Sequence, residues 1–191
     1  MGAFYTSHVL RGPTQQEVLA RLNNRPVFVS ETNAGFTVVL DAACESQDGK
    51  VLAELGASLS AQFHCPVLAI VNHDDDILYF ELYENGEKTD EYNSNPAYFS
   101  EDEDASEEPI GGNAPRLAAV FGASDASRIE RVLRASAEDY VFQTDRHRDL
   151  AEALGVPAFW VGIGHTYAKE GDLPPWVPEG TYVSSNAEGK L

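Results

Sequence analysis

The sequence predicts an α+β protein built on a mostly antiparallel sheet. Short runs of β-branched and aromatic residues alternate with tight-turn signals, first as a hairpin and then as a three-strand meander. Two segments with apolar residues at helical spacing lie among these runs and are expected to pack on the sheet. Further helices and a final strand are expected in the carboxyl-terminal part.

The first 63 residues predict the order strand, helix, hairpin, helix. Residues 4–10 favour a strand, and Thr14 with Glu17 forms the capping-box pattern that begins a helix. Two β-type runs around residues 33–35 predict a hairpin, and apolar positions three and four apart predict a helix over 51–63.

A three-strand meander is predicted next. The run 66–72 is apolar, and the run 77–83 alternates between one apolar face and one mixed face. The residues between them form a polar turn, while Asn85 and Gly86 suit the two positive φ angles of a type I′ turn. The run 87–92 is the third strand.

An acidic segment then divides the chain. Six of the eight residues 101–108 are acidic, and Gly-Gly and Pro follow, so residues 100–114 are expected to form a flexible linker. This predicts an α+β sheet domain over 1–99 and a helical part over 115–191.

The helical part is expected to contain three helices and the final strand. Ser127 and Glu130 are taken as a capping box, and Thr144 is taken as the cap of the third helix. The apolar run 156–167 is interpreted as a buried last strand, with an irregular tail after it.

Charge limits the possible partners. The chain has 31 acidic and 13 basic residues and a net charge of −18, which disfavours nucleic acid and anionic membranes and favours a basic protein partner. No apolar run reaches the roughly 18 residues of a membrane span, and no signal peptide is recognised, so we expect a cytoplasmic protein. Cys44 and Cys65 are expected to be buried free thiols.

Enzyme signatures are absent from the sequence. No phosphate-binding loop, nucleophile elbow or zinc motif occurs, and no cofactor is expected. A catalytic group would assemble only if the helical part folded back over the first turn of the meander. Its members would be His73, Asp74, Arg146, His147 and His165.

Asp74, Asp75 and Asp76 lie between two apolar runs. Aspartates bond to their own backbone in turns, so a polar turn is the first interpretation, a loop that contacts a partner the second and a metal site the third. The spacing does not fit an EF-hand, because the sixth position from Asp74 is Tyr79 and not glycine. No metal is predicted.

The third and second strands of the meander supply a candidate partner surface. Tyrosines offer a large contact area at low entropic cost, and acids steer a basic partner. The residues of this face are Tyr79, Glu81, Tyr83, Asp90 and Tyr92, and the alternative to a partner surface is that a second layer of the same chain covers the tyrosines.

The stretches 73–99 and 146–174 resemble segments of small acidic α+β proteins of bacteria whose activity is not established. The resemblance covers about a third of the chain, implies a bacterial cytosolic origin and carries over no catalytic residue. We expect a non-enzymatic binding protein, with an immunity-type inhibitor of a basic toxin as its concrete version. The alternative is a small enzyme or ligand-binding domain with a site between the loop 72–76 and the last strand. The oligomeric state stays open.

Overall fold

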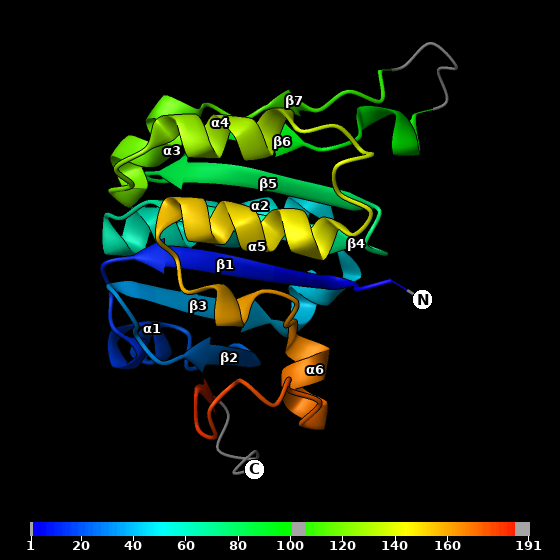
Figure 1. The fold of residues 1–191 in the computed structure, drawn as a ribbon. Helices are drawn as coiled ribbons and strands as arrows, with labels where there is room; N and C mark the ends of the chain where they lie inside the picture. Colours follow the sequence, from blue (N-terminus) through cyan, green and yellow to red (C-terminus); the bar gives the residue numbers. More distant parts are fainter. Residues whose placement is uncertain (1, 101–105, 186–191) are drawn as a thin grey trace.

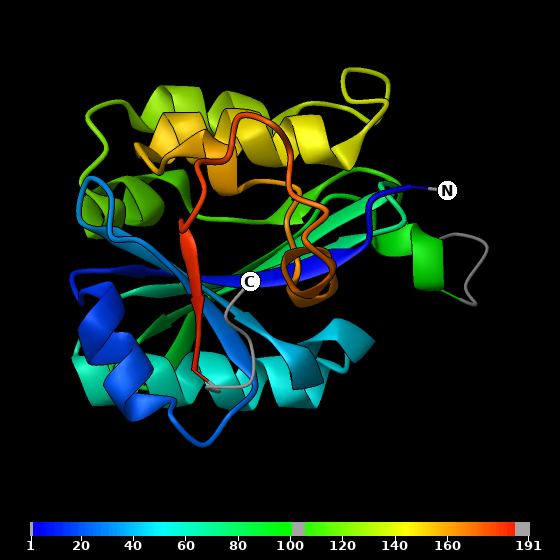
Figure 2. The same ribbon diagram turned by 90° about the horizontal axis from the view of Figure 1, so that it is seen from below.

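A computed structural model describes residues 2–100 and 106–185 and shows one eight-stranded antiparallel sheet between two layers of helices (Figures 1 and 2). The strand order is β7-β6-β5-β4-β1-β3-β2-β8. The strands are β1 (Tyr5–Arg11), β2 (Val27–Ser30), β3 (Phe36–Asp41), β4 (Val67–His73), β5 (Ile77–Glu84), β6 (Glu87–Asn93), β7 (Ile110–Gly111) and β8 (Tyr182–Ser184).

The helices divide between the two faces of the sheet. In Figure 2 the first two helices lie below the sheet and the next three lie above it. The α-helices are α1 (Gln15–Arg21), α2 (Gly49–Phe63), α3 (Ala114–Phe121), α4 (Ala126–Arg134), α5 (Gln143–Leu154) and α6 (His165–Glu170). The described residues also form the short 3-10 helices η1 (Ala42–Ser46), η2 (Pro96–Phe99) and η3 (Ala158–Trp160).

Each face of the sheet has its own apolar core, because alternate side chains of a strand point to opposite faces. On β5, Leu78, Phe80 and Leu82 pack with α3, α4 and α5. Tyr83 from the same strand packs instead with the cluster around α2. Covering both faces explains why nearly all of β5 is buried.

The structure confirms the α+β class, the antiparallel sheet and both predicted tight turns. The hairpin of β2 and β3 turns at Ala34 and Gly35, which have φ angles of +51° and +81°. The turn between β5 and β6 uses Asn85 and Gly86 at +53° and +87°. Asn85 and the two glycines tolerate positive φ, whereas Ala34 adopts it at a steric cost, so local sequence fixes the second turn more strongly than the first.

The final strand is not where the sequence suggested. Residues 156–167, interpreted as a buried strand, form η3, a connection and the start of α6, and the last strand is β8. Pro157 cannot donate a ladder hydrogen bond, and Gly162 has a φ of +85°, so the segment cannot stay extended. Its apolar residues Val156, Trp160 and Ile163 are nonetheless buried in the core under the helices.

Two predicted helix caps are also wrong. The side chain of Asp125 caps α4 by accepting from the backbone N–H groups of Ser127 and Arg128, so Ser127 lies inside the helix. The N-cap position of α5 is Phe142, and Thr144 lies in the first turn. The predicted cap of α1, with Thr14 and Glu17, is confirmed.

The predicted linker falls partly outside the described residues, which omit 101–105. Within the rest, β7 pairs with β6, and Gly112 donates its backbone N–H to the carbonyl of Glu91. The core beside α3, α4 and α5 includes side chains from before and after this segment. The division into a sheet domain and a helical part stays a prediction.

Two expectations from composition can be compared with the fold. Cys44 and Cys65 are buried free thiols, as predicted, and burial raises the pKa of each, to about 12 and about 11. None of the helices in the described ranges combines the length and apolar character that a bilayer crossing requires.

Candidate functional site

The three aspartates form a tight turn between β4 and β5. Asp74 and Asp75 have φ angles of +51° and +65°, and Asp76 donates its backbone N–H to the carbonyl of His73 at 2.9 Å. The turn prediction is confirmed. No group of three or more His, Cys, Asp or Glu side chains suited to a metal ion occurs in the described part of the chain.

Asp75 ties this turn to the start of α5. Its Oδ1 accepts from the backbone N–H and from the hydroxyl of Thr144, both at 2.7 Å, and its carbonyl accepts from the N–H of Gln143 at 3.0 Å. The backbone N–H of Asp75 donates to the carbonyl of Ala3 at 2.9 Å. Asp75 thus joins the turn, the segment before β1 and the start of α5. Its side chain also takes the place of an N-cap for α5, because the residue at the N-cap position, Phe142, has no side-chain acceptor.

Replacing Asp75 by alanine is expected to destabilise the protein more than the same change at Asp74. Both positions carry the cost of alanine at positive φ, but the Asp75 change alone removes the α5 cap, worth about 1–2 kcal/mol. Urea unfolding of the two variants measures the difference. Equal loss in both variants would contradict the capping role of Asp75.

Aromatic side chains gather around this turn, and we call them with their neighbours the turn-end surface. The ring of His73 lies 5.2 Å from Phe4 and 5.0 Å from Phe99, measured between centroids. Tyr98 and Phe99 meet edge to face at 4.9 Å. Val141 and Phe142 are included because they directly precede Gln143, whose backbone N–H donates to the carbonyl of Asp75 in the turn. The turn-end surface consists of Phe4, His73, Asp74, Asp76, Tyr98, Phe99, Val141 and Phe142.

Much of the turn-end surface is exposed. Relative exposure is 41% for Tyr98, 68% for Phe99, 78% for Val141 and 56% for Phe142, which are four of the seven large apolar residues exposed in the described ranges. Figure 1 shows the segments that carry them at one end of the molecule, beside the amino terminus. Exposed apolar residues gathered in one place mark interaction surfaces, whereas scattered ones do not.

Carboxylates border these rings. The hydroxyl of Tyr98 donates to Oδ2 of Asp76 at 3.1 Å, and this hydrogen bond raises the pKa of Tyr98. Oδ2 of Asp74 lies 3.9 Å from Nε2 of His73, whose Nδ1 is 2.7 Å from Oε1 of Gln47. Within the described residues, neither Asp74 nor Asp76 pairs with a lysine or arginine.

The predicted tyrosine face is instead mostly covered. Tyr79, Glu81 and Tyr83 share the face that α2 covers, and Tyr83 lies so close to Gly56 of α2 that a Cβ there would be 2.7 Å from its ring. Both tyrosine hydroxyls donate to Glu81, at 2.8 and 2.5 Å, and Lys88 Nζ donates to it at 3.1 Å. Burial alone would raise the pKa of Glu81, but these three bonds leave it lowered.

Asp90 and Tyr92 lie on the opposite face, because β6 has a bulge. The turn pairs Tyr83 with Lys88, but past the bulge Leu82 pairs with Asp90 and Phe80 with Tyr92. One extra residue reverses which face the rest of the strand presents. Tyr92 is fully buried against Phe80, and Asp90 accepts from the backbone of Asn113 at 2.6 Å.

The prediction that these five residues share one exposed face is therefore wrong. Glu81, Tyr83 and Tyr92 are buried, and only Tyr79 and Asp90 are partly accessible. Binding of a partner by those two stays a prediction. The sequence pointed to the turn at residues 74–76, but it missed Tyr98, Phe99 and Phe142, whose neighbourhood depends on tertiary contacts.

The catalytic group considered from sequence is not assembled by the described contacts, which join only His73 and Asp74 among its five members. His147 is buried and lies 2.7 Å from the hydroxyl of Tyr5. His165 packs against Phe28 of β2, which is three strands away from β4, the strand that carries His73. Arg146 is fully buried, and backbone carbonyls accept its N–H groups.

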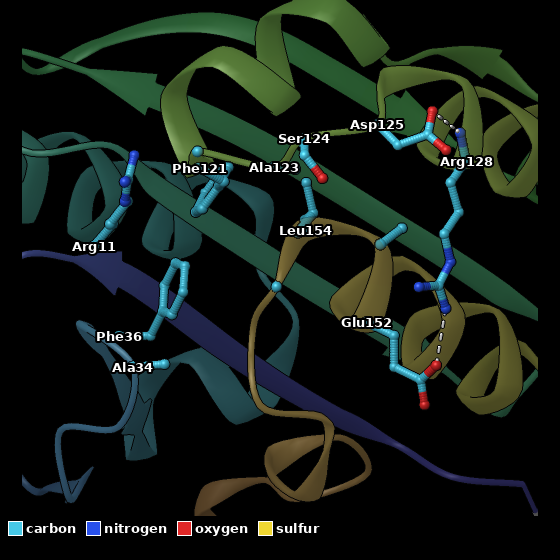
Figure 3. A pocket seen from close by; sticks show the side chains of 13 residues that line it. Arg11, Ala34, Phe36, Phe121, Ala123, Ser124, Asp125, Arg128, Glu152 and Leu154 are labelled. Carbon is cyan, nitrogen blue, oxygen red and sulfur yellow. Dashed lines mark hydrogen bonds and ion pairs between the residues drawn. The ribbon is translucent and has the colours of Figure 1, made fainter.

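A separate hollow of about 420 Å³ lies near β1, where α3 and α5 end and α4 begins (Figure 3). Arg11 lies on one side and donates to the carbonyl of Val120 at 2.7 Å. On the other side Arg128 pairs with Glu152 at 2.9 Å, and Asp125 caps α4. Its two guanidinium groups are thus balanced by two carboxylates, so the hollow offers a charged ligand little net attraction.

Comparison of the chain with protein-family models, with curated proteins and with solved structures found no match.

Proposed function

We propose that this protein is a non-enzymatic binding protein that docks a basic protein partner on the turn-end surface. The observation that carries the proposal is the set of exposed apolar side chains, Tyr98, Phe99, Val141 and Phe142, around a turn whose bordering carboxylates have no lysine or arginine partner among the described residues. Apolar and aromatic groups supply contact area, while carboxylates at the border select against acidic partners.

Charge supports the sign of the partner. Residues 1–114 carry 20 acidic and 5 basic side chains, so the half of the chain that supplies most of this surface is strongly negative. Such a field accelerates the encounter with a cationic protein and makes the association rate fall with added salt. An immunity-type inhibitor that neutralises a basic toxin is the concrete version of this proposal.

The contacts of Asp75 support it further, since they hold the turn, the amino terminus and the start of α5 in one arrangement. A surface that is ordered before binding loses less conformational entropy when the partner docks. The aspartates of the turn therefore have different roles: Asp75 fixes the conformation of the surface, and Asp74 and Asp76 are its solvent-exposed carboxylates.

Photo-crosslinking tests the proposal. A benzophenone amino acid is placed at Phe99, and in a matched control at Trp176, an exposed aromatic residue outside the turn-end surface. In extracts of the native host we expect one protein of high isoelectric point to crosslink at position 99 and not at position 176. The purified partner should bind the unmodified protein, with an association rate that falls at least tenfold between about 20 and 200 mM salt.

Two outcomes would count against it. A partner that is acidic, or whose association rate ignores salt, contradicts electrostatic docking. Equal crosslinking at positions 99 and 176 contradicts the turn-end surface as the docking face. For the toxin-inhibitor version, expression of the partner alone should arrest growth of a bacterial host, and co-expression of this protein should restore it.

A further inference from the structure

The chemistry of the turn-end surface indicates which side chain of a partner it receives. Tyr98 and Phe99 meet at an interplanar angle of 86°, and Phe99 meets His73 at 75°. In an edge-to-face contact one ring presents its edge and the other presents one of its two faces, so each such contact covers at most one face of one ring. Phe99 is 68% exposed and Tyr98 is 41% exposed, so a substantial part of each side chain is accessible to a ligand.

Open ring faces attract cations, because the π electrons make the face of the ring negative. Here the effect adds to that of two carboxylates, since Asp76 is bonded to the Tyr98 hydroxyl and Asp74 lies beside His73. Neither carboxylate has a lysine or arginine partner among the described residues, so their charge is not neutralised by the chain itself.

An arginine side chain fits both features at once. Its planar guanidinium stacks on an aromatic ring and can still direct its N–H groups in plane toward a carboxylate. A lysine ammonium is more strongly hydrated and has no flat face to stack. A surface that offers flat rings with carboxylates at their edges therefore suits guanidinium better than ammonium.

We infer that the turn-end surface binds an arginine side chain of its protein partner, stacked on Phe99 or Tyr98 with its N–H groups donated to Asp76 or Asp74. This inference rests on the proposed function and narrows it, because it names the group of the partner that occupies the surface. The partner's arginine replaces water beside the rings and neutralises two carboxylates that have no lysine or arginine partner among the described residues.

An NMR titration with single amino acid derivatives tests this inference without the partner. The probe is N-acetyl-arginine methylamide, and its matched control is the citrulline analogue, which keeps the shape and loses the charge. We expect the arginine probe to shift the ring signals of Phe99, Tyr98 and His73 with millimolar affinity, and its own δ-methylene protons to move upfield. The citrulline analogue should produce much smaller shifts.

Variants separate the ring faces from the charge. Phe99→Leu keeps an apolar side chain and should weaken arginine binding about two- to fivefold, the value of one exposed cation–π contact. Asp74→Asn combined with Asp76→Asn should weaken it further and remove most of its salt dependence. Trp176→Leu, which removes an exposed ring elsewhere, should leave the affinity unchanged. These residues are exposed, and dispersed amide spectra verify that each variant folds.

Equal shifts from arginine and citrulline, or shifts centred on Trp176, would overturn the inference. Its failure is distinguishable from failure of the proposed function. If a basic partner crosslinks at position 99 but the arginine probe does not bind, the docking face is supported and the arginine inference is refuted. If the probe binds at Phe99 but no basic partner crosslinks there, the arginine inference is supported and the proposed function is refuted.

Discussion

Replacing Arg146 by methionine is expected to lower the free energy of unfolding by about 3–5 kcal/mol, the largest effect of any single substitution proposed here. The guanidinium is fully buried. Nη1 donates to the hydroxyl of Tyr92 at 2.8 Å and to the carbonyl of Val132 at 3.0 Å, and Nη2 donates to the carbonyls of Ala135 and Ser136 at 2.9 Å each. Methionine fills similar space but leaves these acceptors unpaired.

The reason for a buried arginine at this point is geometric. The carbonyls it binds lie at or just beyond the end of α4, where a helix leaves its last C=O groups without intrahelical partners and concentrates partial negative charge. One side chain from α5 satisfies several of them and joins both helices to β6 through Tyr92. The ring of Tyr140, 4.7 Å away, covers the guanidinium.

Arg148→Met is the matched control, two residues along the same helix. Arg148 is exposed and, among the described residues, its one ion pair is with Asp145 at 2.5 Å, so its loss should change stability by no more than about 0.5 kcal/mol. Urea unfolding of both variants at neutral pH measures the two effects. Similar losses in both would show that the carbonyls of α4 do not depend on Arg146.

Acidification from pH 7 to 5 is expected to cost about 2 kcal/mol of stability for each of two buried histidines. Burial lowers the pKa of His147 to about 3 and that of His8 to about 4, against 6.5 in the unfolded chain. Below pH 6.5 the unfolded chain binds protons that the folded protein excludes. Stability is therefore full above pH 6.5 and falls as the pH drops toward the folded-state values.

Glutamine substitutions isolate this effect, because glutamine can replace the polar contacts of His147 with Tyr5 and of His8 with the carbonyl of Leu52 without titrating. The double variant should lose most of the pH dependence of its unfolding free energy between pH 7 and 5. An unchanged slope in the double variant would show that other groups control acid unfolding.

Local chemistry explains which parts of the fold were predictable. The turn at Asn85 and Gly86 could be predicted from these two adjacent residues, because both must adopt positive φ. The helix α2 could be predicted from the spacing of its apolar residues by three and four positions. The cap of α5 could not be found in this way. The cap comes from Asp75, about 70 residues earlier in the chain. Thr144 resembled a cap because threonine is a common N-cap residue, but it lies in the first turn and donates its own N–H to Asp75.

The tyrosine surface shows a second limit. Alternation on β5 correctly separated Leu78 and Phe80 from Tyr79 and Tyr83, but alternation does not say whether the second face meets water or a helix. The bulge between β5 and β6 then moved Tyr92 across the sheet. Of the candidate site, the sequence indicated the aspartate turn, whereas the rings around it were brought there by η2 and the start of α5.

The pairing of β8 with β2 has a consequence for how the protein is made. Val183 of β8 pairs with Val29 of β2, so β2 can complete its pairing only after a strand about 150 residues later has been synthesised. On the ribosome β2 is an open edge with unpaired N–H and C=O groups until β8 has been synthesised, and such edges recruit other strands. Nascent chains should therefore depend on chaperones or rapid release, and slow translation should increase aggregation.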